Sequence, residues 1–149
     1  MEAVEIKYTN KNSLGSTAHW TAAARAHESA RDDRLFDDPW AAALAGKEGL
    51  AWVAGRQPDS LAPMVLRIRF FDDFLERVTR QNAIRQVVLM AAGLDTRAFR
   101  LPWPAGTNVF EIDQPGGLEE KDRLLHSVGV QPTCTRHIIQ ADLTSAWKE

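Results

Sequence analysis

Three short apolar runs alternate with helical segments in the second half of this chain, and this alternation constrains the fold more than any other feature. The runs read QVVLMAA at 86–92, TNVFEI at 107–112 and RHIIQA at 136–141. The first is continuous and rich in β-branched residues, which is typical of a strand buried on both faces. Strands joined by helical crossovers predict a parallel sheet and therefore an α/β fold.

The two crossovers between these runs are expected to differ in length. Pro102 and Pro104 leave room for only a short helix at 96–101, because proline ends or interrupts a helix. The second crossover, at 115–128, carries leucines at helical spacing and ends before Gly129, a residue that commonly follows the last turn of a helix. The pattern predicts strand, short helix, strand, helix and strand, in that order.

The first half of the chain is expected to be helical. Residues 18–30 are rich in alanine and contain no Gly or Pro, and 64–82 place apolar residues at intervals of three and four. Between them, a helix that begins near Pro39 is expected to end near Gly46. Residues 1–17 are polar and are expected to form a mobile arm.

The composition is that of a soluble globular protein with one core. Of 149 residues, 44% are hydrophobic and 26% are charged, and the net charge of -2 gives no reason to expect a nucleic-acid partner. No apolar stretch approaches the ~20 residues that span a bilayer, and no signal peptide is visible, so we expect no membrane partner. A single cysteine, Cys134, excludes a disulfide within the chain and favours the cytoplasm.

The first candidate feature of a site is the segment AAGLDTR at 91–97, directly after the first expected strand. Ligands of open parallel sheets bind at the carboxyl ends of the strands. Small residues at Ala91 and Gly93 would let a ligand come close to the backbone there. Taken alone, the segment is equally well explained as a tight turn.

Acidic residues follow the second and third expected strands. Glu111 and Asp113 lie two positions apart and so point to the same side of a strand, where a carboxylate can accept hydrogen bonds from a vicinal ribose diol. After the third strand, Asp142 is placed to accept from the exocyclic amine of adenine, and Leu143 to pack on the purine. Each feature alone also fits a solvated strand end or a turn, but together with 91–97 they predict a nucleoside site.

The turn after the first strand distinguishes between nucleosides. A dinucleotide-binding turn has the pattern G-x-G-x-x-G and a full helix facing the pyrophosphate, whereas this chain has Ala91 and a helix cut short by two prolines. Asp95 would repel a pyrophosphate, but it is compatible with the ammonium group of a methionine, either in direct contact or as the N-cap of the short helix. The residues therefore favour S-adenosylmethionine over NAD.

The stretch QVVLMAAGLDTRAFRLPWPAGTNVFEIDQP at 86–115 resembles the leucine carboxyl methyltransferase family, in particular its bacterial branch of S-adenosylmethionine-dependent O-methyltransferases. The upstream segments WTAAARAHESARDDRLFDDPWAAALAG and RIRFFDDFL are similar to the same branch, so the resemblance runs from about Thr17 to the C-terminus. It implies a Rossmann-like methyltransferase fold preceded by N-terminal helices. We expect an N-terminal arm and helical cap at 1–85 and the first half of the cofactor-binding domain at 86–149.

The resemblance also implies which residues bind the cofactor. An Arg that pairs with the methionine carboxylate falls on Arg67, with Arg69 as the alternative, and the bidentate geometry of such a pair is the reason to expect Arg there. The family's Gly-rich position falls on 91–93, and its acidic ligand falls on Asp113. The full set of expected cofactor-binding residues is Arg67, Ala91, Gly93, Asp113, Asp142 and Leu143.

The same resemblance implies that family members continue well past residue 149, with further strands and helices that close the pocket. We therefore expect the fold to be truncated after its third parallel strand. The first strand would then lie at an exposed apolar edge, and such an edge favours self-association.

The function indicated is that of an S-adenosylmethionine-dependent O-methyltransferase acting on a carboxylate or hydroxyl of a small molecule or a protein terminus. No residue is indicated as a catalytic base and no metal site is expected. His19 and His27 are the histidines worth testing, because the family's N-terminal helices border the active site. Two alternatives stay open: a non-catalytic truncated fragment or edge-mediated assembly module, and a nucleotide-binding oxidoreductase fragment, against which Asp95 and the short helix count.

Overall fold

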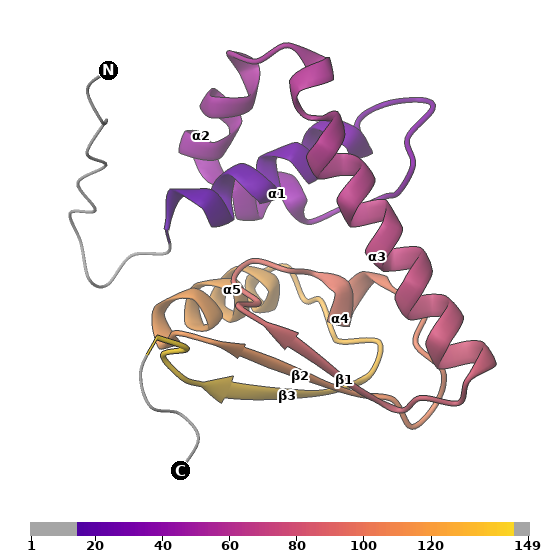
Figure 1. Cartoon of the computed structure of the whole chain (residues 1–149). Coiled ribbons are helices and arrows are strands. Elements are labelled where there is room, and N and C mark those ends of the chain that lie inside the picture. The colour runs from indigo at the N-terminus through magenta and orange to yellow at the C-terminus, as the bar shows by residue number, and fades with distance from the viewer. Residues whose placement is uncertain (1–14, 145–149) are drawn as a thin grey trace.

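The computed structural model describes residues 15–144 and shows a helical cap above a small α/β layer (Figure 1). The expected arm at 1–17 lies almost entirely outside the described residues. In chain order the elements are α1 (Ser16–Ser29), α2 (Ala41–Ala54), the short 3-10 helix η1 (Pro58–Ser60), α3 (Ala62–Gln81), β1 (Gln86–Met90), α4 (Arg97–Arg100), β2 (Asn108–Asp113), α5 (Pro115–Ser127) and β3 (Thr135–Gln140).

The three strands form one parallel sheet in the order β1-β2-β3. Gln86 is in register with Asn108, which is in register with Thr135 on the next strand. The crossovers are the four residues of α4 and the thirteen residues of α5, as the prolines and leucines predict. The expected Rossmann-like α/β class, with parallel strands and helical crossovers preceded by helices, is confirmed.

Helices cover one face of this sheet. Residues in register point to the same side, so Val87 and Val109 belong to one face and Val88 and Met90 to the other. Val109 is fully buried, whereas Val88 is 55% and Met90 is 56% exposed. Figure 1 shows the reason, since α4, α5 and the cap all lie on the same side of the sheet. We call the covered side the packed face and the other side the open face.

The prediction that 86–92 forms a strand buried on both faces is therefore wrong for the described chain. A continuous apolar run does not distinguish a strand covered on both sides from one whose second side stays open. The expectation that this strand lies at an edge is met, since β1 has β2 as its one neighbour in the described sheet. The side chains of the open face are those of Val88, Met90, Phe110, Ile112, His137 and Ile139.

Gly46 interrupts α2. Its φ of 60° and ψ of -176° are non-helical, so a first helical segment ends at this residue as predicted, and a second segment follows to Ala54. In the second segment, Trp52 stacks on Trp20 of α1 with 5.2 Å between the ring centroids. Gly49 packs so closely on α1 that a Cβ there would lie 2.7 Å from the carbonyl oxygen of His19. These contacts hold the second part of α2 against α1.

The cap and the sheet layer share one hydrophobic core. Ala22 of α1 and Leu44 of α2 lie in the same buried cluster as Val87 of β1, Phe99 of α4 and Leu125 of α5. Burial of apolar surface is the main force that holds such layers together. The shared core therefore fixes the cap over the strand ends, and with it the space between them.

Candidate functional site

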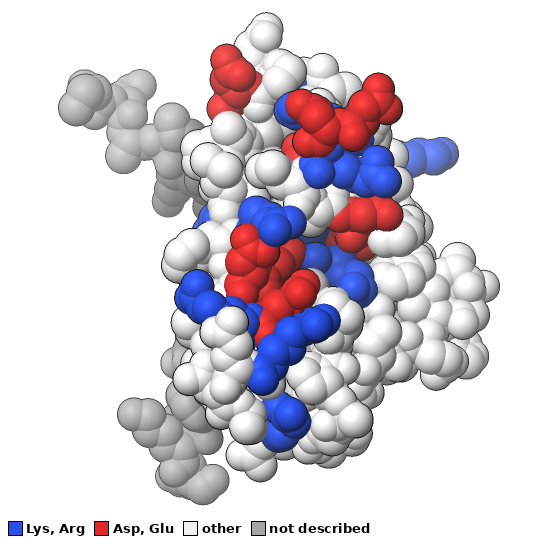
Figure 2. Space-filling view, turned by 90° about the vertical axis from the view of Figure 1, so that its right-hand side faces the viewer, with Lys and Arg blue, Asp and Glu red and all other residues white. Residues whose placement is uncertain are grey.

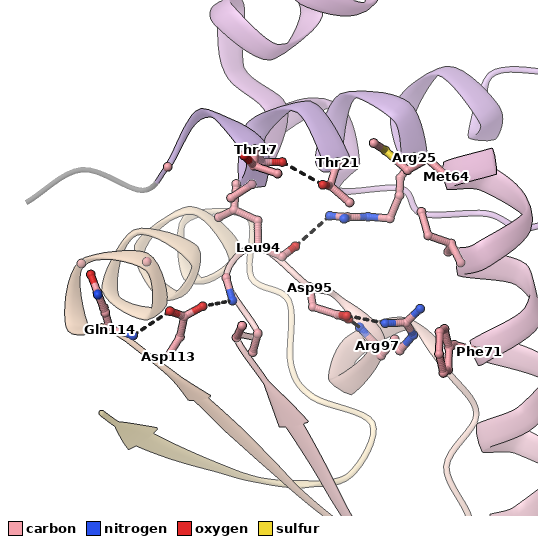
Figure 3. Close-up of a pocket in the computed structure, with 18 of the residues that line it drawn as sticks. Thr17, Thr21, Arg25, Met64, Phe71, Leu94, Asp95, Arg97, Asp113 and Gln114 are labelled. Atoms are coloured by element: carbon pink, nitrogen blue, oxygen red, sulfur yellow. Dashed lines mark hydrogen bonds and ion pairs between the residues drawn. The ribbon is translucent and has the colours of Figure 1, made fainter. Parts of the chain in front are cut away.

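A cavity of about 820 Å³ lies between the cap and the carboxyl ends of β1 and β2 (Figure 3). Helix α1 contributes Thr21 and Arg25, and α3 contributes Phe71. The turns that follow β1 and β2 contribute Asp95 and Asp113. This is the edge at which open parallel sheets bind ligands, so the cavity is the candidate site.

Asp113 stands at the end of β2 and lines the cavity. One carboxylate oxygen accepts the backbone N–H of Gly93 at 2.6 Å, and the other accepts the N–H of Gln114 at 2.7 Å. An ionised carboxylate offers about four acceptor sites on its two oxygens. Asp113 therefore ties the turn after β1 to the end of β2 and keeps acceptor capacity for a ligand.

Ala91 and Gly93 also line the cavity, and both have a left-handed backbone, with φ of 52° and 43°. Glycine adopts this conformation freely, whereas an L residue with a Cβ pays about 1–2 kcal/mol for it. The turn thus takes the shape of a Gly-rich turn although one of its positions is alanine. Its small side chains leave the backbone accessible from the cavity.

Asp95 lies just before α4 and lines the cavity. One oxygen accepts the backbone N–H of Arg97, the first residue of α4, at 2.8 Å, and the other pairs with the Arg97 guanidinium. Burial by itself would raise the pKa of Asp95, but the charges of Arg97 and Arg25 outweigh it and hold that pKa below its usual value. The N-cap of α4 is Thr96, so the predicted N-cap role of Asp95 is wrong by one residue, although Asp95 accepts an N–H of the first turn. The carboxylate that lines the cavity is ionised at neutral pH.

Arg67 and Arg69 point to different places, although they are two residues apart on α3. Arg67 lines the cavity and has no ion pair with any residue in the described range 15–144. Arg69 pairs with Asp73 at 2.8 Å and donates to the carbonyl oxygen of Leu35, and it does not line the cavity. Of the two, only Arg67 is placed to meet a ligand there.

Asp142 and Leu143 do not line this cavity. They follow β3, which β2 separates from β1. Hydrogen bonds from the side chain and backbone of Thr144 hold the pKa of Asp142 below its usual value, and Gln114 contributes to the same effect. Since Gln114 does line the cavity, Asp142 lies one side chain away from it. The structure brings Arg67, Ala91, Gly93 and Asp113 together and leaves the other two expected residues outside.

Glu111 has a structural role rather than a place in the cavity. It is fully buried on the packed face, where its carboxylate pairs with Lys121 at 2.7 Å and with Arg136 at 2.6 Å. Lys121 is itself fully buried and also donates to the backbone oxygen of Asp95 at 2.9 Å. Of the two acidic residues on β2, only Asp113 lies far enough along the strand to reach the cavity.

The two histidines singled out from the sequence lie away from the cavity. The ring of His19 bonds to the carbonyl oxygen of Leu44, His27 lines a separate small groove, and neither lines the cavity. Within residues 15–144 no group of His, Cys, Asp and Glu is arranged to hold a metal, and no helix is long and apolar enough to cross a membrane. On the face shown in Figure 2, acidic and basic side chains lie next to one another, and neither sign forms a separate patch.

Comparison with known proteins decides the family. The model of the family described as leucine carboxyl methyltransferase matches residues 18–149. This chain belongs to the leucine carboxyl methyltransferase family. The match includes the cap as well as the strand ends around the cavity, so the expected resemblance is confirmed over nearly the whole chain.

Curated relatives of this family member carry the name "Putative S-adenosyl-L-methionine-dependent methyltransferase". The relative from Parafrankia sp. (strain EAN1pec) is 47% identical over 146 residues, that from Saccharopolyspora erythraea 44% over 147, and that from Mycobacterium marinum 41% over 150. The alignments cover 90–91% of this chain but 47–49% of the relatives. The chain thus spans about half the length of the curated relatives it matches.

Apart from Arg67, the sequence did not single out the cap residues that line the cavity of this leucine carboxyl methyltransferase family member. Arg25 is the clearest case, because it is buried on a helix face next to the fully buried Ala22, Ala23 and Ala24. A charge on such a face was a usable signal, since buried charges are paired and hydrogen-bonded. The sequence could not identify the partners of Arg25, because hydrophobic periodicity does not show which part of the fold a helix packs against.

Proposed function

We propose that this chain forms the part of an S-adenosyl-L-methionine site that holds the nucleoside and the methionine end of the cofactor in a methyltransferase. The observation that carries the proposal is the cavity of about 820 Å³, with Asp113 at the end of β2 and Arg67 on α3 in its wall, a guanidinium with no ion pair to residues 15–144. The names of the relatives support the same cofactor. In this proposal 1–85 supply the arm and cap, and 86–149 the first half of the cofactor-binding domain.

The residues at the strand ends fit the nucleoside. Asp113 uses its two oxygens on the N–H groups of Gly93 and Gln114 and retains acceptor sites for the two ribose hydroxyls. The accessible backbone at 91–93 gives the nucleoside a surface without bulky side chains. We place the adenine toward Asp142 and Leu143, since Asp142 is linked to the cavity wall through Gln114.

The residues nearer the cap fit the amino-acid end. Arg67 lacks a carboxylate partner among residues 15–144, and a guanidinium pairs with a carboxylate in a bidentate way. Asp95 supplies an ionised carboxylate to an ammonium group. Arg67 and Asp95 thus offer one charge of each sign to the two charges of a methionine.

When bound, the cofactor supplies an electrophilic methyl group on a sulfonium. The residues of this chain bind and orient that group, and such orientation supplies much of the acceleration in a displacement reaction. We propose that the acceptor is a carboxylate or hydroxyl oxygen on a small molecule or a protein terminus. We place the reaction in the cytoplasm, because the single Cys134 has no partner for a disulfide.

Titration calorimetry with S-adenosylhomocysteine and with NAD tests the proposal. We expect the first to bind and the second not to bind, because α4 has only four residues and Asp95 would repel a pyrophosphate. Replacing Asp113→Ala should weaken S-adenosylhomocysteine binding by about tenfold or more, since hydrogen bonds to a charged group are worth roughly 1.5–3 kcal/mol.

The matched control is Asp73→Ala, which removes an exposed carboxylate that pairs with Arg69 outside the cavity. This control should bind like the wild type. Tight NAD binding would contradict the proposal, as would S-adenosylhomocysteine binding that is unchanged in Asp113→Ala.

One observation favours a second function, edge-mediated assembly: the edge strand β1 carries the exposed side chains of Val88 and Met90. We propose that two copies associate through this strand. Sedimentation velocity should then show dimers at high concentration, and Val88→Lys should remove them, because a charge on an edge strand opposes pairing. Gln81→Lys, at the end of α3, is the control. A wild-type monomer at every concentration would exclude this function.

A further inference from the structure

A buried ionic network joins the cap to the turn that follows β1. It consists of three carboxylates and three guanidinium groups, drawn from α1, the α1–α2 connection, α3, the β1–α4 turn and α4. Its members are Arg25, Asp38, Asp72, Asp95, Arg97 and Arg100. The function proposed above uses only Asp95 from this set, so the role of the others is open.

One arm of the network runs from α1 to the turn. Arg25 donates to the Asp38 carboxylate at 2.7 Å and to the backbone oxygen of Leu94 at 2.7 Å, and Figure 3 shows this second bond reaching down from α1. The hydroxyl of Thr96 donates to the same Asp38 oxygen at 2.6 Å. The residues on both sides of Asp95 are therefore anchored to the cap.

The other arm runs from α3 to Asp95 itself. Asp72, which is 4% exposed, accepts from Arg97 at 2.7 Å and from Arg100 at 2.7 and 2.9 Å. Arg97 then donates to the carboxylate of Asp95 (Figure 3). Asp72 itself does not line the cavity, so it acts on a ligand through the two arginines it holds, which do line it, and Arg97 connects it to Asp95.

The charges in this network compensate each other, three negative against three positive. If Asp72 lost its charge, Arg97 and Arg100 of α4 would stay positively charged but would lose one of the carboxylates that compensate them. An uncompensated buried charge is costly and acts over several ångströms at low dielectric. Arg97 would then draw Asp95 more strongly toward itself, and the excess positive charge would lie where an ammonium group is proposed to bind.

We propose that Asp72 is a positioning residue for the methionine end of the cofactor, acting from the cap through Arg97 on the orientation and charge of Asp95. This inference rests on the proposed cofactor site. It assigns two tasks to α3: Arg67 meets the ligand directly, and Asp72 positions the carboxylate of Asp95 through Arg97.

The test compares two ligands that share the nucleoside and differ in the amino acid. S-adenosylhomocysteine has the amino-acid end, and 5′-methylthioadenosine lacks it. In Asp72→Asn, the first ligand should bind about tenfold more weakly, because one buried charge is left uncompensated, while the second should bind within about twofold of wild type. The neighbouring Asp73→Asn, on an exposed carboxylate, should change neither affinity.

Arg97→Lys is the second variant and keeps the network neutral. A lysine donates from a single ammonium and cannot reproduce the planar fork that bridges Asp72 and Asp95. It should lower the affinity for S-adenosylhomocysteine and spare 5′-methylthioadenosine, even if Asp72→Asn does not fold. Calorimetry of both variants, with circular dichroism to verify folding, gives the two affinities.

The possible outcomes distinguish a failure of the role proposed for Asp72 from a failure of the proposed cofactor site. Equal losses for both ligands in the variants would show that Asp72 has a purely structural role and would overturn this inference while leaving the cofactor site standing. Unchanged S-adenosylhomocysteine binding in both variants would overturn it as well. A wild-type chain that binds neither ligand would overturn the proposed function, and this inference with it.

Discussion

The two faces of the sheet are made by the same three strands but are held in different ways. On the packed face, Val109 is buried under helices and Glu111 is paired with Lys121 and Arg136. On the open face, Val88 is exposed although it follows Val87, the register partner of Val109. The packed face also supports the cavity, since Lys121 links Glu111 to the backbone of the turn at Asp95. The site therefore depends on one face of the sheet.

The largest effect is expected from Glu111→Gln on the packed face. The substitution leaves Lys121 and Arg136 buried with one negative charge fewer, and breaking a buried ion pair costs about 3–5 kcal/mol. Chemical denaturation should show this loss in the free energy of unfolding. Glu119→Gln, at an exposed position on α5, should stay within about 0.5 kcal/mol. Similar values for the two variants would remove the distinction between the faces.

A pair of valine truncations sharpens the comparison at neighbouring positions. Val109→Ala removes two buried methyl groups and should cost about 2 kcal/mol through lost contacts and a cavity. Val88→Ala removes the same groups from the open face and should cost under about 0.5 kcal/mol. Thermal unfolding of both variants measures the difference. An equal cost would mean that the open face of β1 is covered in solution.

A smaller effect on the free energy of unfolding is expected in the turn that follows β1. Ala91→Gly relieves a left-handed backbone but raises the entropy of the unfolded chain, so we expect a net gain of about 0.5 kcal/mol. The adjacent Ala92→Gly relieves nothing and should lose about 1 kcal/mol. Denaturant titrations that show a loss for both variants would mean that the strain at Ala91 is negligible.

The smallest effect on stability is expected from ionisation of the Cys134 thiol, which lies just before β3. Burial raises its pKa from 9.0 to about 11, so about one molecule in a thousand carries the thiolate at pH 8. Iodoacetamide should react roughly a hundredfold faster after unfolding, in line with the difference between the two pKa values. Because the folded state holds this proton more tightly, stability should fall as the pH rises from about 9 to about 11. Equal rates in both states would contradict the burial.

The features that local sequence determines were predictable. The apolar runs and the two prolines predicted the order and crossover lengths of the sheet, because hydrophobic periodicity and helix breaking act over a few residues. The strand ends then pointed to Asp113 and Gly93, since parallel strands bring their carboxyl ends to one edge. Both residues line the cavity.

The features that depend on packing across the chain were not predictable. Arg25 and Leu94 are 69 positions apart and Asp72 and Arg97 are 25 apart, so no local pattern joins them. The exposure of Val88 depends on which elements cover the sheet, and the sequence of the strand is the same whether its second face is covered or open.

The contact between Gly49 and the backbone of His19 has a consequence for engineering the cavity. Since α1 carries Thr21 and Arg25 in the cavity wall, the spacing between α1 and α2 sets where that wall stands. A methyl group at position 49 would push α1 and α2 apart, because it would lie 2.7 Å from the carbonyl oxygen of His19. A larger side chain at position 49, which does not line the cavity, is therefore expected to move the α1 side of the cavity wall.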